Sequence, residues 1–122
     1  MYSIRVEVRF SALHQLALSD GSREPLHGHD WVAHVTCRAE QLDASGMVAD
    51  FEDVRRRCQV VVQRLHYTNL NEHPVFAGQP TAERVAKWIF DELHGGGLSC
   101  TQAVEVEELP GCRASYAPAV PS

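Results

Sequence analysis

Apolar and polar residues alternate near the start of the chain, which is the pattern of a half-buried strand. The run from Ile4 to Phe10 has an apolar residue at every second position, and it predicts a first strand from Tyr2 to about His14. A loop with turn residues follows, and a second strand is expected from His29 to Leu42. Its two expected faces carry Trp31, Ala33, Val35 and Cys37 on one side, and Val32, His34 and Thr36 on the other.

The spacing of apolar residues then changes to the period of a helix. A first helix is predicted from a cap at Asp50 to about Leu65, because an aspartate at this position accepts the free N–H groups of the first turn. A second helix is predicted to begin with Thr81 as its cap and to end at Gly95-Gly96-Gly97. The helix residues expected to be buried are Phe51, Val54, Cys58, Val61, Val62, Leu65, Val85, Trp88, Ile89 and Leu93.

The end of the chain predicts two more strands. The third runs from Leu98 to Leu109, and the fourth runs from Arg113 to Tyr116 after a turn at Pro110-Gly111. The order ββααββ indicates an α+β domain in which a four-stranded antiparallel sheet carries two helices on one face. We expect a single domain over residues 1–118 and a loose tail at residues 119–122.

The chain has 122 residues and a formal net charge of −5 at pH 7. This length gives one domain, small for an enzyme with a closed pocket, so a pocket built between subunits is expected. A nucleic-acid binder should carry a basic face, so no nucleic-acid partner is expected. No apolar run reaches membrane-spanning length, and the first residues lack the basic start and apolar middle of a signal peptide. We therefore expect a cytoplasmic protein without a membrane partner.

The four cysteines lack the Cys-x-x-Cys spacing of redox and metal motifs. In a reducing compartment they are most simply small buried apolar residues, which is our interpretation of Cys37 and Cys58. Cys112 lies close in sequence to a candidate site residue, and it is kept as a minor candidate for chemistry.

Three histidines are the main candidates for chemistry. His27 and His29 are two residues apart, so in a strand they project side by side. His14 ends the first strand, and antiparallel pairing of the two strands would bring the three imidazoles together. Three neutral nitrogen ligands suit Zn²⁺, and an open fourth position is typical of a catalytic zinc. A structural zinc would need a fourth protein ligand, and an accidental cluster is the other alternative, because a lone His-x-His is a weak signal.

Several short segments occur in a characteristic order along the chain. They are Phe10-Ser11-Ala12-x-His14, Leu26-His27-Gly28-His29, Gly46-Met47-Val48-x-Asp50-Phe51, Leu70-Asn71 and Pro80-Thr81-Ala82-Glu83. The ordered set resembles the 6-pyruvoyl-tetrahydropterin synthase and 6-carboxytetrahydropterin synthase family, from about Val6 to Tyr116. The resemblance implies the tunnelling fold, in which sheets from several subunits form a barrel, and a homo-oligomer, with a hexamer favoured.

The same resemblance implies roles for individual residues. His14, His27 and His29 match the family's zinc ligands. Glu108, eight positions before Tyr116, matches the glutamate that anchors the pterin substrate. A carboxylate can accept hydrogen bonds from the ring N–H and the exocyclic amino group of a pterin. The alternative for Glu108 is a surface acid at the end of a strand.

Two segments depart from the family pattern. Arg23 occupies the position of the catalytic cysteine and is followed by Glu24, which resembles the form of the family that carries a glutamate instead. That form cleaves 7,8-dihydroneopterin triphosphate to 6-hydroxymethyl-7,8-dihydropterin, a folate precursor. The family's Leu-Asp-His-x-x-Leu-Asn is replaced by a segment with His66 in the place of the acid and Tyr67 in the place of the histidine. A one-residue shift of this loop would let His66 serve as the proton relay, with Tyr67 as a weak acid.

Together these features predict a zinc-dependent lyase that acts on the side chain of 7,8-dihydroneopterin triphosphate. Glu24 and His66 are the catalytic candidates, Glu108 the substrate-binding residue, and Zn²⁺ the cofactor. Glu24 as an ordinary loop acid is the simpler interpretation of that residue. The alternative function is a non-catalytic pterin- or purine-binding protein that kept the pocket and lost the proton relay.

Overall fold

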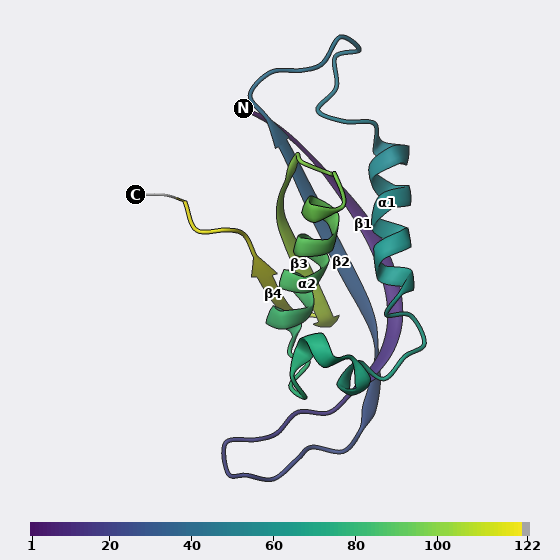
Figure 1. Cartoon of the computed structure of the whole chain (residues 1–122), viewed down its shortest axis with the longest axis vertical. Helices are drawn as coiled ribbons and strands as arrows, with labels where there is room; N and C mark the ends of the chain where they lie inside the picture. The colour runs from purple at the N-terminus through teal and green to yellow at the C-terminus, as the bar shows by residue number, and fades with distance from the viewer. Residues whose placement is uncertain (121–122) are drawn as a thin grey trace.

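The computed structural model describes residues 1–120 and contains one four-stranded antiparallel sheet with two helices on the same face (Figure 1). The order of the strands in the sheet is the same as their order in the sequence. The elements are β1 (Tyr2–His14), β2 (His27–Ala39), α1 (Phe51–Gln63), η1 (Leu70–Glu72), η2 (Pro74–Phe76), α2 (Ala82–Gly95), β3 (Thr101–Leu109) and β4 (Cys112–Tyr116). The predicted α+β class and the ββααββ order are confirmed.

The core lies between the helices and one face of the sheet. Helix α1 packs on β1, and α2 packs on β3 and β4. Phe10 of β1 pairs with Trp31 of β2 in the ladder, and their rings stack with centroids 5.8 Å apart. The core face of these two strands consists of buried residues at alternate positions, as predicted: Val6, Val8, Phe10, Ala12, Trp31, Ala33, Val35 and Cys37. The same alternation continues into His14, His27 and His29 at the end of the sheet.

Both helices begin at the predicted caps. The Asp50 carboxylate accepts hydrogen bonds from the N–H groups of Glu52 and Asp53, and the Thr81 hydroxyl accepts one from Arg84. These contacts satisfy N–H groups that have no partner inside a helix. Phe51 is a correction, because it is 56% exposed where burial was expected. It lies at the first turn of α1, where it lines a surface hollow with Tyr2 and Met47 instead of packing on the sheet.

The strand boundaries also differ from the expected ones. Strand β2 begins at His27, because His27 pairs with His14 at the end of the β1 ladder, and it ends at Ala39 where Leu42 was expected. The chain turns there, and the Asp43 carboxylate accepts hydrogen bonds from two N–H groups of the following loop. The segment between the two predicted helices contains the two short 3₁₀ helices, η1 and η2.

The last two strands also have shifted starts. Strand β3 begins at Thr101 where Leu98 was expected, because the N–H of Thr101 donates to the carbonyl of Leu98 and closes a turn. Strand β4 begins one residue early, at Cys112. Of the predicted tail, residues 119 and 120 belong to neither helix nor strand, and residues 121 and 122 lie outside the described residues. Within residues 1–120, no helix is long and apolar enough to cross a membrane.

Candidate metal and pterin site

The register of β1 and β2 brings the three predicted histidines together. His14 is paired with His27, and His29 is paired with Ala12, two residues before His14. One ligand atom from each histidine lies within 4.8 Å of the other two. Because side chains alternate across a strand, all three rings lie on the core face of the sheet.

Two of the rings are oriented by backbone carbonyls. The Nδ1 atom of His14 lies 3.0 Å from the carbonyl oxygen of Pro80, and that of His27 lies 2.7 Å from the carbonyl oxygen of Pro25. A carbonyl oxygen can only accept a hydrogen bond, so each Nδ1 atom is the donor. In the neutral ring the lone pair is then on Nε2, which is the arrangement typical of histidines that bind a metal.

The other nitrogen atoms fit a metal ion. Within residues 1–120, the Nε2 atoms of His14 and His29 are buried and have no hydrogen-bond partner. A buried polar atom left unpaired costs about 1–3 kcal/mol. A cation bound by both lone pairs would remove this cost. Burial lowers the pKa of His29, the two neighbouring histidines lower it further, and Glu108 opposes the shift. The lowered pKa favours the neutral imidazole that a metal requires.

Glu108 lies beside the histidine triad, although it is distant from the triad in the sequence. Its Oε1 atom is 3.1 Å from Nε2 of His14 and 4.0 Å from Nε2 of His29. It occupies an irregular position in the β3–β4 ladder, where the register shifts between Glu107 and Leu109. The carboxylate also borders a surface hollow that Cys112 lines from the next strand.

Glu24 lies beside His27, in the connection between β1 and β2. Its Oε1 atom accepts a hydrogen bond from the N–H of Leu16 and lies 3.8 Å from Nε2 of His27. A backbone hydrogen bond from the N–H of Glu24 to the carbonyl of Leu16 holds the same two segments together. The structure therefore brings the predicted Glu24 to the histidines.

Two side-chain amides hold this connection, and the sequence pattern did not indicate this role for them. The side-chain amide of Asn71 forms hydrogen bonds with both the N–H and the carbonyl of Gln15, and the amide of Gln79 does the same with Ala17. Each amide thus takes the place of a backbone peptide group in a neighbouring strand. Leu70-Asn71 had been noted as a motif, but no local signal pointed to Gln79.

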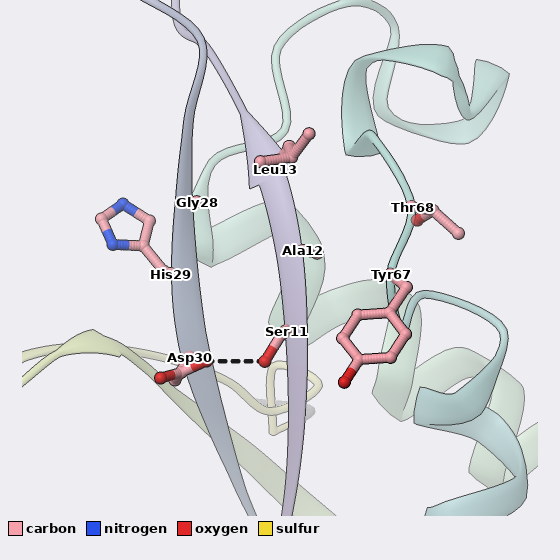
Figure 2. Close-up of a pocket in the computed structure, with 8 residues that line it drawn as sticks. All are labelled: Ser11, Ala12, Leu13, Gly28, His29, Asp30, Tyr67 and Thr68. Atoms are coloured by element: carbon pink, nitrogen blue, oxygen red, sulfur yellow. Dashed lines mark hydrogen bonds between the residues drawn. The ribbon is translucent and has the colours of Figure 1, made fainter.

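His66 is not brought to the triad within the described chain. Its Nδ1 atom accepts a hydrogen bond from the backbone N–H of Ser11, at the outer edge of β1, and its ring stacks on Tyr67 with centroids 3.7 Å apart. Tyr67 is 83% exposed. In Figure 2 the His29 ring extends to one side of the two strands, and the Tyr67 ring lies on the other side.

A hollow of about 360 Å³ lies between Tyr67 and the ends of β1 and β2 (Figure 2). The Ser11 hydroxyl donates a hydrogen bond of 2.6 Å to the Asp30 carboxylate at its border. Gly28 also lines the hollow, and a Cβ atom at this position would lie 3.2 Å from a methyl carbon of Leu13. The glycine between the two histidines therefore permits close packing of the neighbouring strand.

Cys37 and Cys58 are buried, as expected of structural residues. Within residues 1–120 all four cysteines are free, and Cys37 and Cys58 are fully buried. Burial raises the pKa of Cys58 to about 12 and raises that of Cys37 further. Cys112 is exposed.

The family whose sequence model matches this chain is described as 6-pyruvoyl tetrahydropterin synthase, and the match covers residues 3–119. The chain belongs to the 6-pyruvoyl tetrahydropterin synthase family. A relative from Synechocystis sp., named 6-carboxy-5,6,7,8-tetrahydropterin synthase, is 32% identical over 95% of this chain and 93% of its own length.

Solved structures of the 6-pyruvoyl tetrahydropterin synthase family share the fold. The Caenorhabditis elegans 6-pyruvoyl tetrahydropterin synthase superposes with a TM-score of 0.83 at 25% identity, covering 97% of this chain and 96% of that one. A Plasmodium vivax 6-pyruvoyltetrahydropterin synthase, described as a catalytic-residue mutant with a glutamate changed to alanine, superposes with a TM-score of 0.74 at 16% identity, covering 98% of each chain.

Proposed function

We propose that this chain is a zinc-dependent lyase that acts on the side chain of 7,8-dihydroneopterin triphosphate, with 6-hydroxymethyl-7,8-dihydropterin as the candidate product. The observation that carries the proposal is the histidine triad, whose ligand atoms lie within 4.8 Å of one another, while within residues 1–120 two of its buried nitrogen atoms lack a hydrogen-bond partner. Membership of a family of pterin synthases makes a pterin the expected substrate class.

His14, His27 and His29 would hold the zinc ion. Bound zinc would supply a Lewis acid that polarises a side-chain hydroxyl of the substrate. The carbonyl groups of Pro80 and Pro25 fix two of the rings, which keeps the metal-binding nitrogen atoms directed at the same point.

Glu24 would accept the proton during the reaction. Two features support this role: its carboxylate lies 3.8 Å from His27, and the N–H of Leu16 holds one of its oxygen atoms in place. A general base must lie within reach of the proton that it removes, and a position at the rim of the triad meets this requirement. The glutamate described as a catalytic residue in the Plasmodium vivax protein is a precedent for a carboxylate in this role.

Glu108 would anchor the pterin ring. Its side chain is partly exposed, lies 3.1 Å from His14 and lines a surface hollow with Cys112. Its two oxygen atoms can accept hydrogen bonds from the adjacent N–H groups of a pterin, which would orient the side chain of the substrate toward the histidines.

We also propose a homo-oligomer with a pocket shared between subunits, and a hexamer is favoured by the family resemblance. The sheet has two edge strands, β1 and β4. The loop that contains Tyr67 covers part of the β1 edge, and the parts of an edge that stay unpaired are available to another chain. His66 and Tyr67 lie at the edge of β1, so His66 could serve as the relay only for a site on a neighbouring subunit. Light scattering after size exclusion tests this, and a monomer at micromolar concentration would contradict it.

The deciding experiment incubates zinc-loaded protein with 7,8-dihydroneopterin triphosphate and identifies the product by mass. A shortened or altered side chain supports the lyase. The replaced cysteine and Asp-His positions favour the second candidate, a non-catalytic pterin- or purine-binding protein. Tight binding of the pterin without any change in its mass would select that function.

A further inference from the structure

The contact between Glu108 and His14 joins two atoms that both accept hydrogen bonds. Nδ1 of His14 donates to the carbonyl of Pro80, so in the neutral ring Nε2 carries only a lone pair. A carboxylate likewise offers only lone pairs. The two atoms are 3.1 Å apart, yet within residues 1–120 Nε2 of His14 has no hydrogen-bond partner. Such a contact is unfavourable unless a proton on one of the two groups or a metal ion between them relieves it.

The spacing of these atoms matches that of ligands around one metal ion. Zinc–ligand bonds of about 2.0–2.2 Å at tetrahedral angles place neighbouring ligand atoms roughly 3.3–3.6 Å apart. The distances from Oε1 of Glu108 to Nε2 of His14 and of His29, 3.1 Å and 4.0 Å, lie on either side of this range. Glu108 thus lies within reach of a metal ion held by His14 and His29.

Glu24 is the competing candidate for a fourth ligand, and it fits less well. Its Oε1 atom approaches only His27, at 3.8 Å, and already accepts a hydrogen bond from the N–H of Leu16. Glu108 approaches two of the histidines. Within residues 1–120, the Glu108 carboxylate accepts none of the side-chain hydrogen bonds found in the structure, whereas Glu24 accepts one.

We propose that Glu108 is the fourth ligand of the metal while the pterin is absent, and that it leaves the metal to bind the pterin. This inference rests on the proposed function, because it concerns the same metal and the same substrate. The hollow of about 330 Å³ that Glu108 borders gives the carboxylate room to move. The substrate would then open the coordination position at which it reacts, and the empty protein would keep the zinc four-coordinate and shielded.

The first measurement is zinc affinity, determined by competition with a coloured chelator. Glu108→Ala should weaken zinc binding by at least about 100-fold, since outer-shell partners alone are worth about 10–100-fold. Glu108→Gln keeps the size of the side chain and should also weaken binding. Glu107→Ala is the matched control: it removes a neighbouring carboxylate that accepts a hydrogen bond from Arg113, and its zinc affinity should equal that of the unchanged protein.

The second measurement is the visible spectrum of the Co²⁺-substituted protein, which reports the ligands directly. Glu108→Ala should change the spectrum of the pterin-free protein. Addition of neopterin, which has no triphosphate, should change the spectrum of the unchanged protein and leave that of Glu108→Ala almost unaltered. Circular dichroism and thermal melting establish that each variant is folded.

The outcomes separate this inference from the proposed function. If Glu108→Ala and Glu108→Gln bind zinc and Co²⁺ as the unchanged protein does but bind neopterin weakly, Glu108 is only the pterin anchor and the inference is wrong. Loss of zinc in Glu24→Gln alone would assign the fourth position to Glu24 and would also overturn it. If the unchanged protein binds no zinc, the proposed function itself fails.

Discussion

Histidines lie beside β1 at two places, at its C-terminal end and along its outer edge. Their ring nitrogens are hydrogen-bonded differently at the two places. At the end of the strand, the rings of His14, His27 and His29 share one face, and two of their buried Nε2 atoms have no hydrogen-bond partner among residues 1–120. At the outer edge, Nδ1 of His66 accepts a hydrogen bond from the N–H of Ser11. Buried polar atoms are nearly always paired in proteins, and a cation bound by the three histidines would pair these two Nε2 atoms. The hydrogen bond of His66 is explained by a structural role, because it satisfies a backbone N–H of β1.

The two places also differ in how the backbone is held. The triad is built on a regular ladder, whereas His66 lies in a loop in which Tyr67 has a φ of 58°. This left-handed conformation costs a non-glycine residue about 1–2 kcal/mol. Hydrogen bonds from the N–H of Tyr67 to Ser11 and from the N–H of Leu13 to Thr68 fix the loop against β1. The loop therefore covers the outer edge of β1, and the β1–β2 ladder positions the three histidines of the candidate site.

The strongest test of this comparison removes the metal ligands. The unchanged protein should carry about one zinc ion per chain, and the double variant His27→Ala/His29→Ala should lose the zinc and all turnover. Metal analysis and the product assay measure the two effects. The fold should survive in the circular dichroism spectrum, because the core lies mostly beyond the triad. Full retention of zinc by the folded double variant would refute the metal site.

The next largest effect is expected at Glu24. Glu24→Gln keeps the size of the side chain and removes the base, so kcat should fall by about 10²–10⁴. Zinc content and pterin affinity should stay unchanged, since the histidines and Glu108 are untouched. Asp20→Asn is a suitable control, because Asp20 lies in the same connection and its carboxylate contacts Ser22. Turnover of Glu24→Gln at the normal rate would make Glu24 a bystander.

A smaller effect, on stability, is expected at His66. His66→Ala leaves the N–H of Ser11 without its partner, which should lower the free energy of unfolding by about 1–3 kcal/mol. Zinc content should not change. Denaturant unfolding and metal analysis test these two statements. Loss of zinc in this variant would contradict the statement that His66 has no part in metal binding. If the folded variant turns over normally, His66 is not the proton relay.

The smallest effect concerns the cysteines. Burial raises the pKa of Cys58 to about 12 and raises that of Cys37, so near pH 8 iodoacetamide should label exposed Cys112 first and leave these two unlabelled. Peptide mass mapping gives the order of labelling. Because these folded-state pKa values exceed the unfolded value of about 8.5, the stability that they contribute is complete below that pH and is lost as the pH rises above it. Rapid labelling of Cys58 in the folded protein would show that the core opens.

A substitution at Cys112 tests whether its thiol takes part in the reaction. Cys112 lines the hollow that Glu108 borders, but the proposed chemistry does not use its thiol. Cys112→Ser should therefore retain activity. A loss of activity comparable to that of Glu24→Gln would move the base from Glu24 to Cys112.

The sequence alone determined the elements and the triad, because both depend on local spacing. A period of two residues placed His27 and His29 on one face, and the capping carboxylate and hydroxyl of Asp50 and Thr81 set where the helices begin. The expected convergence of His14 followed from antiparallel pairing of neighbouring strands. The family resemblance identified Glu24 and Glu108 as candidates.

Only the tertiary structure decided which of these residues meet. The shift in the ladder beside Glu108 and its 3.1 Å approach to His14 depend on the pairing of strands that are far apart in the sequence. The exposure of Phe51 depends on which segments pack against the first turn of α1, and the helical period does not specify them. A histidine at position 66 can act as a proton relay, but its Nδ1 atom is engaged by the backbone N–H of Ser11. Local patterns specify what a residue can do, and long-range packing specifies which partner it finds.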